Sequence, residues 1–247
     1  MMFDEKILHR LSGCRNVSIL TGAGVSAESG IATFRDPDGL WSKFNPAELA
    51  SVDGFIANTE LVWSWYRYRV EIIENAKPND GHYAIAKMQS LFYNFDLITQ
   101  NVDRLHQRAG SKDVIELHGN IINNHCFECK MNFDGETALP EGQLPLCGNC
   151  GGRIRPDVIW FGEQLPPKAI KHAEHSAENS DVFFSVGTSG EVYPAASLPI
   201  IAKQKGALVV EVNPRTTSIS NFMDYCIRET SAIAFPKLLE EFGRYLE

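Results

Sequence analysis

A glycine-rich segment close to the N-terminus contains residue types that can hold the pyrophosphate of a dinucleotide. Gly22 and Gly24 follow the apolar run 17–20, which has the character of a buried strand, and Arg35 adds a cation further on. A strand that ends in a glycine-rich turn brings backbone N–H groups close to a bound phosphate. Ala27 occupies the place of the third glycine in the usual dinucleotide pattern, so the pattern alone is also compatible with a simple tight turn.

Four cysteines have the spacing of a zinc ribbon. Two Cys-x2-Cys pairs, separated by seventeen residues, are formed by Cys126, Cys129, Cys147 and Cys150. Each pair can place two sulfur atoms about 2.3 Å from a single ion, and four sulfur ligands leave no open coordination position. We therefore predict one structural zinc ion rather than a catalytic one. Two disulfides or a redox-active pair are the alternatives, and a reducing compartment disfavours them.

Polar turns follow four further apolar runs. Ligands of an open parallel sheet bind outside the carboxyl ends of its strands, so these turns are expected to meet at one site. Gly119 leaves room for a substrate beside His118, and we predict that His118 is a general base near neutral pH, although an isolated histidine is more often structural. The turns are Thr99-Gln100-Asn101-Val102-Asp103, Glu116-Leu117-His118-Gly119-Asn120, Gly187-Thr188-Ser189 and Glu211-Val212-Asn213-Pro214.

The alternation of short apolar runs with helical stretches predicts the elements that position these turns. Strand, turn and helix in repetition predict an α/β fold with a Rossmann-like, doubly wound parallel sheet. A segment rich in Cys, Gly, Pro and Asn, 124–155, interrupts the alternation and predicts a small inserted domain held together by the metal. Strands are expected at 17–20, 96–99, 114–117, 182–186 and 207–212, and helices at 57–76, 82–92, 102–109, 166–179, 195–205 and 236–247.

Composition and charge limit the classes of function. The 247 residues suffice for one large core with a small appended module. The net charge of −8 and the lack of an obvious basic patch argue against a nucleic-acid-binding surface. No run approaches the ~20 apolar residues of a membrane span, and the first residues lack the apolar region of a secretory signal. We expect a cytoplasmic monomer with neither nucleic acid nor membrane as a partner.

These motifs, in this order, resemble those of the sirtuins, a family of NAD-dependent protein lysine deacylases. The resemblance runs from about residue 10 to 241 and includes the segment 22–36, the strand-end turns, the four cysteines and Trp160-Phe161-Gly162-Glu163. It implies an NAD-binding domain over about 1–36, 81–123 and 156–247, a helical insertion over about 37–80 and a zinc module over about 124–155. Segment 228–232 departs from the family, because it lacks a small Gly- and Pro-rich turn, and this leaves the adenine-side contacts least defined.

The resemblance also implies a mechanism in which NAD is a consumed co-substrate and the zinc is structural. The amide oxygen of the acyl-lysine attacks the ribose as nicotinamide leaves, and His118 accepts a ribose hydroxyl proton. Water then releases lysine and 2'-O-acyl-ADP-ribose. Asn101 and Asp103 hold the nicotinamide end and complete the implied catalytic set, whereas Gly187, Ser189 and Asn213 meet the adenosine half of NAD. The implied NAD-binding residues are Gly22, Ala23, Gly24, Ala27, Thr33, Phe34, Arg35, Trp41, Gln100, Asn101, Val102, Asp103, His118, Gly187, Thr188, Ser189, Asn213, Pro214 and Ser231.

A Tyr-x2-Arg pair on the helix expected at 57–76 bears on the acyl group. Tyr66 and Arg69 share a helix face, and a solvated arginine on an amphipathic helix is the plainer interpretation. The sirtuin branch that removes succinyl and malonyl groups has such a pair beside a small residue, which aligns here with Ala50. A guanidinium can bind a carboxylate through two hydrogen bonds. We therefore predict activity on acidic acyl groups alongside deacetylation, with the substrate peptide paired to Val158, Trp160, Phe161, Gly162 and Glu163.

Other functions remain open at this level. A Rossmann dehydrogenase expects an acidic residue about 20 positions after the glycines, at the end of a second strand, whereas the stretch 35–45 is irregular. A noncatalytic NAD-binding module has little need for His118 beside Asn101 and Asp103. A plain deacetylase and a protein mono-ADP-ribosyltransferase share every motif except the Tyr-x2-Arg pair, and they are the nearest alternatives.

Overall fold

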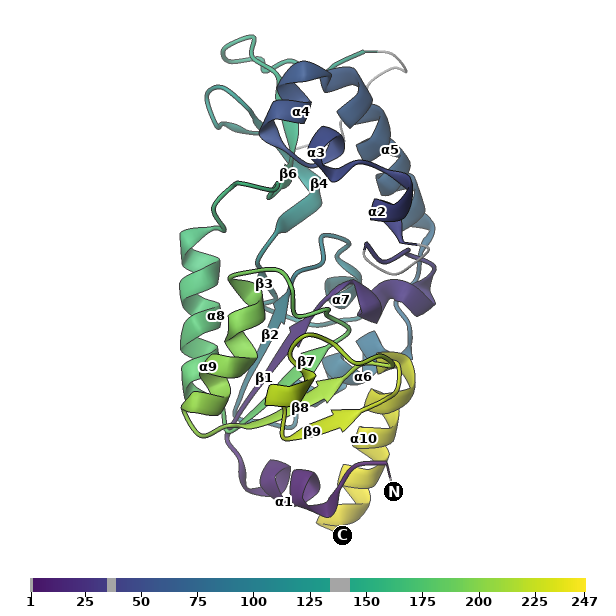
Figure 1. The fold of residues 1–247 in the computed structure, drawn as a ribbon, viewed down its shortest axis with the longest axis vertical. Helices are drawn as coiled ribbons and strands as arrows, with labels where there is room; N and C mark the ends of the chain where they lie inside the picture. Colours follow the sequence, from purple (N-terminus) through teal and green to yellow (C-terminus); the bar gives the residue numbers. More distant parts are fainter. Residues whose placement is uncertain (1, 35–38, 134–142) are drawn as a thin grey trace.

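The computed structural model describes residues 2–34, 39–133 and 143–247, and Figure 1 shows them arranged as two lobes along the longest axis of the molecule. The larger lobe is built on a parallel sheet with the strand order β3-β2-β1-β7-β8-β9. Its strands are β1 (Asn16–Thr21), β2 (Asn94–Thr99), β3 (Ile115–Glu116), β7 (Val182–Val186), β8 (Leu208–Val212) and β9 (Tyr225–Ile227).

Helices cover both faces of this sheet (Figure 1). Ile19 and Phe184 pack against α1, α6 and α10, whereas their neighbours Leu20 and Phe183 pack against α8 and α9 on the other face. Successive strand residues point to opposite faces, so a strand buried on both sides needs a continuous apolar run. The helices are α1 (Glu5–Gly13), α6 (Asp80–Met88), α8 (Pro167–Asn179), α9 (Leu198–Gln204) and α10 (Ser231–Leu246).

The smaller lobe combines helices with an antiparallel sheet of strand order β5-β4-β6. Its helices and its sheet share one apolar core, in which Phe55 and Val62 belong to the same cluster as Ile121 and Ile154. The two predicted insertions therefore pack together, while the domain boundaries themselves stay a prediction. The elements are α2 (Leu40–Lys43), α3 (Pro46–Leu49), α4 (Val52–Ala57), α5 (Thr59–Asn75), β4 (Gly119–Cys126), β5 (Asn132–Phe133) and β6 (Ile154–Val158).

The five predicted strands are present, but several helices differ from the prediction. The helix expected at 82–92 runs from Asp80 to Met88. The helix expected at 102–109 is reduced to α7 (Leu105–Arg108), because Arg104 adopts a left-handed φ of 58° and the Asp103 carboxylate accepts the Leu105 N–H at 2.9 Å. The last helix begins at Ser231, so Pro236 lies inside it instead of at its start. Not predicted were β9, the strands of the smaller sheet, α1 to α4, and the 3₁₀ helices η1 (Ala23–Ser29) and η3 (Ser220–Phe222). The helix expected at 195–205 begins as the 3₁₀ helix η2 (Ala195–Ser197) and continues as α9.

No helix in the described part of the chain is both long and apolar enough to cross a membrane.

The loops that follow β1 and β7 touch through their backbones, and this contact requires glycine. The N–H of Gly22 donates to the Val186 carbonyl at 3.0 Å, and the N–H of Gly24 donates to the Gly187 carbonyl at 2.8 Å. A Cβ atom at Gly22 or Gly24 would lie 2.8 Å from backbone atoms of Gly187. The sequence pattern predicts that the turn at these glycines brings backbone N–H groups to a phosphate, but the neighbouring loop already demands both glycines. Both N–H groups serve this contact, so other groups have to bind a phosphate.

Gly24→Ala is expected to lower the free energy of unfolding by about 1–3 kcal/mol, because the new Cβ has to displace backbone atoms of Gly187. Gly243→Ala in α10 is the matched control, since nothing lies within 4 Å of its added Cβ. That control is expected to gain up to about 1 kcal/mol from helix propensity. Urea denaturation measures both changes, and an undiminished stability of the Gly24 variant would refute the steric argument.

Candidate active site

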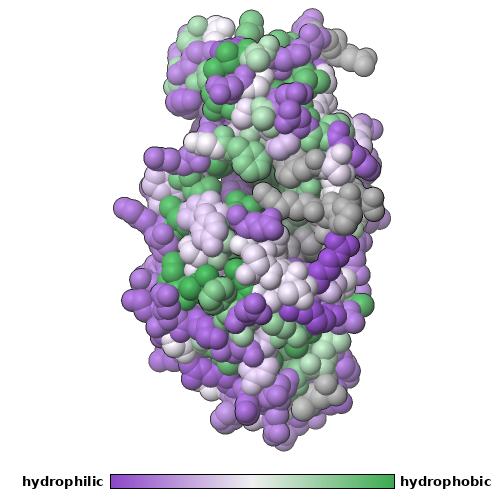
Figure 2. All heavy atoms as spheres, in the orientation of Figure 1, coloured by the Kyte–Doolittle hydropathy of each residue, from purple (hydrophilic) through white to green (hydrophobic). Residues whose placement is uncertain are grey.

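A cavity of about 590 Å³ is lined by residues of both lobes, and the face shown in Figure 2 is hollowed at the level where the lobes meet. Loops at the carboxyl ends of β1, β2, β7 and β8 form much of its wall, as expected for a parallel sheet. Arg35 lies outside the described residues, as does the side chain of Trp41. Every other predicted NAD-site residue lines the cavity, and so do Ala50, Tyr66, Arg69, Val158, Trp160, Phe161, Gly162 and Glu163.

Ser26 joins the two predicted residues that follow β2. Its buried hydroxyl donates to Asp103 Oδ2 at 2.7 Å and accepts from Asn101 Nδ2 at 3.2 Å. The same Asn101 nitrogen donates to the Gly22 carbonyl at 3.1 Å. Burial raises the pKa of Asp103, although hydrogen bonds from the Leu105 N–H and from Ser26 oppose the rise. The sequence offers Ser26 as a hydroxyl donor beside the glycines, but its role beside Asp103 depends on a contact with a residue 77 positions away.

His118 lies two residues beyond β3 and is partly buried at the cavity wall. Its Nδ1 is 3.0 Å from the carbonyl oxygen of Gln100. A carbonyl oxygen can only accept, so this contact assigns the ring hydrogen to Nδ1 and leaves the lone pair of the neutral ring on Nε2. An imidazole in this tautomer can take up a proton at Nε2, which is the chemistry required of a general base.

Thr188 connects the loops that follow β2, β7 and β8. Its hydroxyl accepts from Gln100 Nε2 at 3.0 Å, and its carbonyl accepts from Asn213 Nδ2 at 3.1 Å. Thr230 and Ser231, where α10 begins, also line the cavity, and their buried hydroxyls have no hydrogen-bond partner in the described part of the chain. Such hydroxyls fit a ligand with many polar groups, as NAD has.

Tyr66 and Arg69 extend from α5 to the same cavity. Tyr66 is 3% exposed, and its oxygen accepts a hydrogen bond from Trp160 Nε1 at 2.8 Å. Burial raises the pKa of Tyr66 to about 12. The phenol therefore keeps its proton at neutral pH and can donate it to an acceptor in the cavity.

The guanidinium of Arg69 is a buried charge. The residue is only 4% exposed, and the guanidinium carbon lies 5.1 Å from the ring centroid of Phe34 and 5.3 Å from that of Trp65. Burial lowers the pKa of Arg69, whereas Tyr66 and the Asp103 charge oppose that effect. Among the residues that the structure describes, no carboxylate forms an ion pair with Arg69. A buried charge is costly without an opposite charge nearby, so this end of the cavity favours an anionic group on a ligand.

A buried ion pair shapes the segment predicted to bind the peptide. Arg155 in β6 is 2% exposed and donates to both carboxylate oxygens of Glu163, at 2.5 and 2.8 Å. Its guanidinium carbon lies 3.5 Å from the ring centroid of Trp160. Burial acts to raise the pKa of Glu163, but hydrogen bonds from Arg155 and the Trp160 N–H outweigh it and lower that pKa. Arg155 was not predicted, because Pro156 and Asp157 follow it in β6 and the strand has no apolar run to indicate a buried charge.

Backbone donors of the same segment are already used within the protein. The N–H of Ile159 donates to the His118 carbonyl at 2.9 Å, and the N–H of Phe161 donates to the Ala50 carbonyl at 2.9 Å. Phe161 also forms a parallel bridge with Ser51. Pairing of a substrate peptide with this segment stays a prediction, and it has to rely chiefly on the carbonyl groups here.

The four predicted cysteines converge. All their Sγ atoms lie within 4.8 Å of one another, with 3.5 Å between Cys126 and Cys150 and 3.7 Å between Cys129 and Cys147. A tetrahedron with Zn–S bonds of about 2.3 Å has edges of about 3.8 Å. All four thiols are free, and their separations far exceed the ~2.05 Å of a disulfide bond. The residues therefore fit one structural zinc, and none of them lines the cavity.

Comparison with known proteins gives consistent matches. The model of the Sir2 family matches residues 22–194, which is more than half of the chain. The NAD-dependent protein deacylase of Aquifex aeolicus is 52% identical over 233 residues, which cover 92% of this chain and 97% of that protein. A solved Sir2 homologue in complex with NAD has a TM-score of 0.93 and 44% identity, with 99% of this chain and 96% of that chain covered.

A second solved structure holds three bound molecules, one of which is the inhibitor EX-527. It is a Sir2 protein bound to 2'-O-acetyl-ADP-ribose and a deacetylated p53 peptide, with a TM-score of 0.86 and 33% identity. The match covers 97% of this chain and 99% of that chain. The likeness to these proteins extends over nearly the whole chain, so it includes both lobes and the cavity between them.

Elemental analysis of the purified protein is expected to find one equivalent of zinc. Cys147→Ser should lose the metal and lower the melting temperature, because metal binding at such a site contributes folding free energy. Cys226→Ser is the control, since Cys226 is exposed and does not belong to the four-cysteine cluster. Zinc-free protein with an unchanged melting temperature would rule out a structural metal.

Proposed function

The chain belongs to the Sir2 family, and we propose that it removes acyl groups from protein lysine side chains at the expense of NAD. One observation carries this proposal: His118, the Asn101–Asp103 pair and the loops after β1, β7 and β8 line one cavity. The products are the free lysine, nicotinamide and 2'-O-acyl-ADP-ribose. NAD and acyl-lysine proteins or peptides are the proposed partners, whereas the monomeric state, the cytoplasmic location and the lack of nucleic-acid or membrane partners stay predictions.

The roles of the residues follow from their contacts. Bound NAD supplies a ribose carbon whose bond to nicotinamide is exchanged for a bond to the acyl oxygen. Hydrogen bonds to Ser26 hold Asn101 and Asp103 in place, so both side chains are already positioned to orient the nicotinamide end of NAD. His118 takes the ribose hydroxyl proton at Nε2, while its Nδ1–H bond to the Gln100 carbonyl maintains the required tautomer.

A mono-ADP-ribosyltransferase and a plain deacetylase remain the two alternatives. Both would use the same NAD pocket, so the pocket does not discriminate between them. A mono-ADP-ribosyltransferase would leave the acyl group on lysine, whereas the proposed enzyme removes it. A plain deacetylase would remove acetyl groups but not succinyl or malonyl groups.

We further propose that the acyl groups include succinyl and malonyl. Arg69 at 4% exposure is not the solvated arginine of a plain amphipathic helix. A carboxylate at the tip of the acyl chain would provide the ion-pair partner that Arg69 lacks among the described residues, and the protonated Tyr66 phenol would donate one more hydrogen bond. Ala50, a small residue that lines the cavity, leaves space for the longer chain.

His118→Ala is expected to lower kcat for acyl-lysine peptides by about 10²–10⁴-fold, because the general base is lost. NAD binding, measured by calorimetry, should stay nearly unchanged. His172→Ala is the control, since His172 is exposed on α8 and contacts Asp96 instead of the cavity. Near-normal turnover by the His118 variant would mean that another group acts as the base.

Arg69→Met is expected to cut kcat/KM for succinyl-lysine by roughly 30- to 1,000-fold, because a charge-assisted contact in a dry pocket contributes about 2–4 kcal/mol. Acetyl-lysine has no carboxylate, so its kcat/KM should change little. Arg67→Met is the control on the same helix, where the guanidinium instead donates to the Gln143 carbonyl at 2.6 Å.

Tyr66→Phe is expected to show the same selectivity with a smaller effect, since one neutral hydrogen bond contributes about 1 kcal/mol. This variant also removes the acceptor for Trp160 Nε1, so a modest loss with both peptides is expected as well. Equal losses with succinyl and acetyl peptides in the Arg69 variant would identify this helix face as scaffold and the enzyme as a plain deacetylase.

A further inference from the structure

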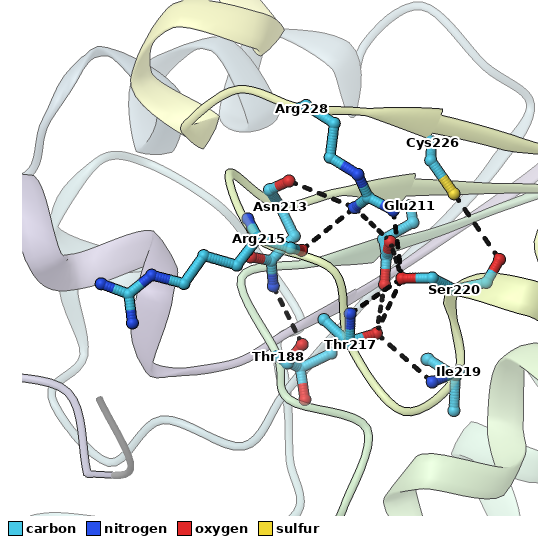
Figure 3. Close-up of polar contacts among 9 residues, drawn as sticks. All are labelled: Thr188, Glu211, Asn213, Arg215, Thr217, Ile219, Ser220, Cys226 and Arg228. Atoms are coloured by element: carbon cyan, nitrogen blue, oxygen red, sulfur yellow. Dashed lines mark hydrogen bonds and ion pairs between the residues drawn. The ribbon is translucent and has the colours of Figure 1, made fainter. Parts of the chain in front are cut away.

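Glu211 is a buried carboxylate that does not line the cavity. It lies in β8, its side chain is 1% exposed, and three side chains surround it (Figure 3). It accepts hydrogen bonds from the Thr217 hydroxyl, from Ser220 Oγ at 2.6 Å and from Arg228 Nη1 at 2.5 Å. A buried carboxylate is tolerated only when it is paired and hydrogen-bonded, so these four residues form one unit.

Arg228 extends this unit to the loop that follows β8. Its Nη1 also donates to the carbonyl of Asn213 at 3.3 Å and to the carbonyl of Arg215 at 3.1 Å. Its Nη2 donates to Ser220 Oγ at 3.1 Å. Figure 3 shows the guanidinium of Arg228 between the Glu211 carboxylate and this loop. The Arg228 side chain, one residue past the end of β9, thus restrains two carbonyl groups of the loop that follows β8.

The restrained loop is a wall of the cavity. Residues 213–218 all line it, and the Thr217 hydroxyl that binds Glu211 belongs to this loop. Asn213 carries the restraint onward, because its amide accepts the Arg215 N–H at 3.1 Å and donates to the Thr188 carbonyl at 3.1 Å. The Glu211–Arg228 pair therefore holds the loops after β7 and β8 from behind, on the side away from the ligand.

This wall lies on the other side of β1 from the residues assigned to chemistry, and the Gln100–Thr188 hydrogen bond joins the loops after β2 and β7. His118, Asn101 and Asp103 follow β2 and β3, whereas the restrained loops follow β7 and β8 on the other side of β1. The resemblance assigned the adenosine half of NAD to Gly187, Ser189 and Asn213. Loosening this wall should therefore weaken the binding of NAD without altering the environment of the reacting bonds.

We propose that Glu211 and Arg228 are positioning residues that set the affinity for the adenosine half of NAD. The proposal rests on the proposed function, because it takes this cavity as the NAD site. It also gives a role to Arg228, which opens the segment where the chain departs from the family pattern. Neither side chain has to touch the ligand, since both act through the loop that does.

Glu211→Gln tests the proposal, because it keeps the shape of the side chain and removes its charge. The KM for NAD should rise about tenfold, while kcat at saturating NAD stays within about twofold and the KM for the acyl-peptide is unchanged. Arg228→Lys keeps the charge but cannot reach both carbonyls of the loop, so its KM for NAD should be intermediate. Binding of ADP-ribose, measured by calorimetry, should weaken in parallel with the rise in KM.

Lys203→Met is the matched control. Lys203 forms an ion pair with Asp224 at 2.7 Å beside the same strands, and neither residue lines the cavity. Its KM for NAD should equal that of the wild type. The melting temperature of each variant shows whether it folds. If Glu211→Gln does not fold, the KM of Arg228→Lys for NAD decides the test in its place.

The outcomes separate this proposal from the one on which it rests. Wild-type protein that does not bind ADP-ribose would overturn the proposed function. If the folded Glu211→Gln and Arg228→Lys variants bind ADP-ribose as tightly as the wild type does, the proposed function stands and the positioning role is overturned. A loss confined to kcat, with unchanged affinity for ADP-ribose, would also overturn it.

Discussion

The cavity depends on the direct contact between the backbones of two loops at the centre of the parallel sheet. Gly22 and Gly24 after β1 meet Gly187 after β7 so closely that no Cβ atom fits between them. Because β1 and β7 are neighbours in the sheet, this contact sets how the loops on either side are placed. The loops after β2 and β3 lie on one side with the groups assigned to chemistry, and the loop after β8 lies on the other. The glycines thus shape the cavity by letting the two loops pack closely, whether or not a ligand is bound.

The buried charged side chains in and behind the cavity wall are paired with hydrogen-bond donors or opposite charges, and Arg69 is the exception. Asp103 has Ser26 and a backbone N–H, Glu163 has Arg155, and Glu211 has Arg228. Each of these pairs fixes a different stretch of the wall, which suits a site that has to be formed before its ligands bind. In the described residues Arg69 has aromatic rings around it but no carboxylate within ion-pair distance. The contrast with the paired charges is the physical reason to expect its partner on the substrate.

The parts of the site that lie at strand ends could be predicted from sequence, because a parallel sheet brings those ends to one edge. The apolar runs at 17–20 and 182–186 identified β1 and β7, and the polar residues after each run line the cavity. The four cysteines were predictable for a similar reason, since ligand spacing is a local property. β9 could not be predicted, because three residues without a long apolar run carry little signal. Ion pairs such as Arg155–Glu163 were missed because they form only once the chain has folded.

Mass spectrometry of a complete reaction shows whether the chain transfers an acyl group from lysine to ADP-ribose. Acetyl-lysine and succinyl-lysine peptides would each be incubated with the protein and NAD, and all products would be weighed. We expect one deacylated peptide, one nicotinamide and one O-acyl-ADP-ribose for each NAD consumed, with the succinyl peptide among the substrates. A peptide that keeps its acyl group and gains the mass of ADP-ribose, or acyl release as a free acid without loss of NAD, would contradict it.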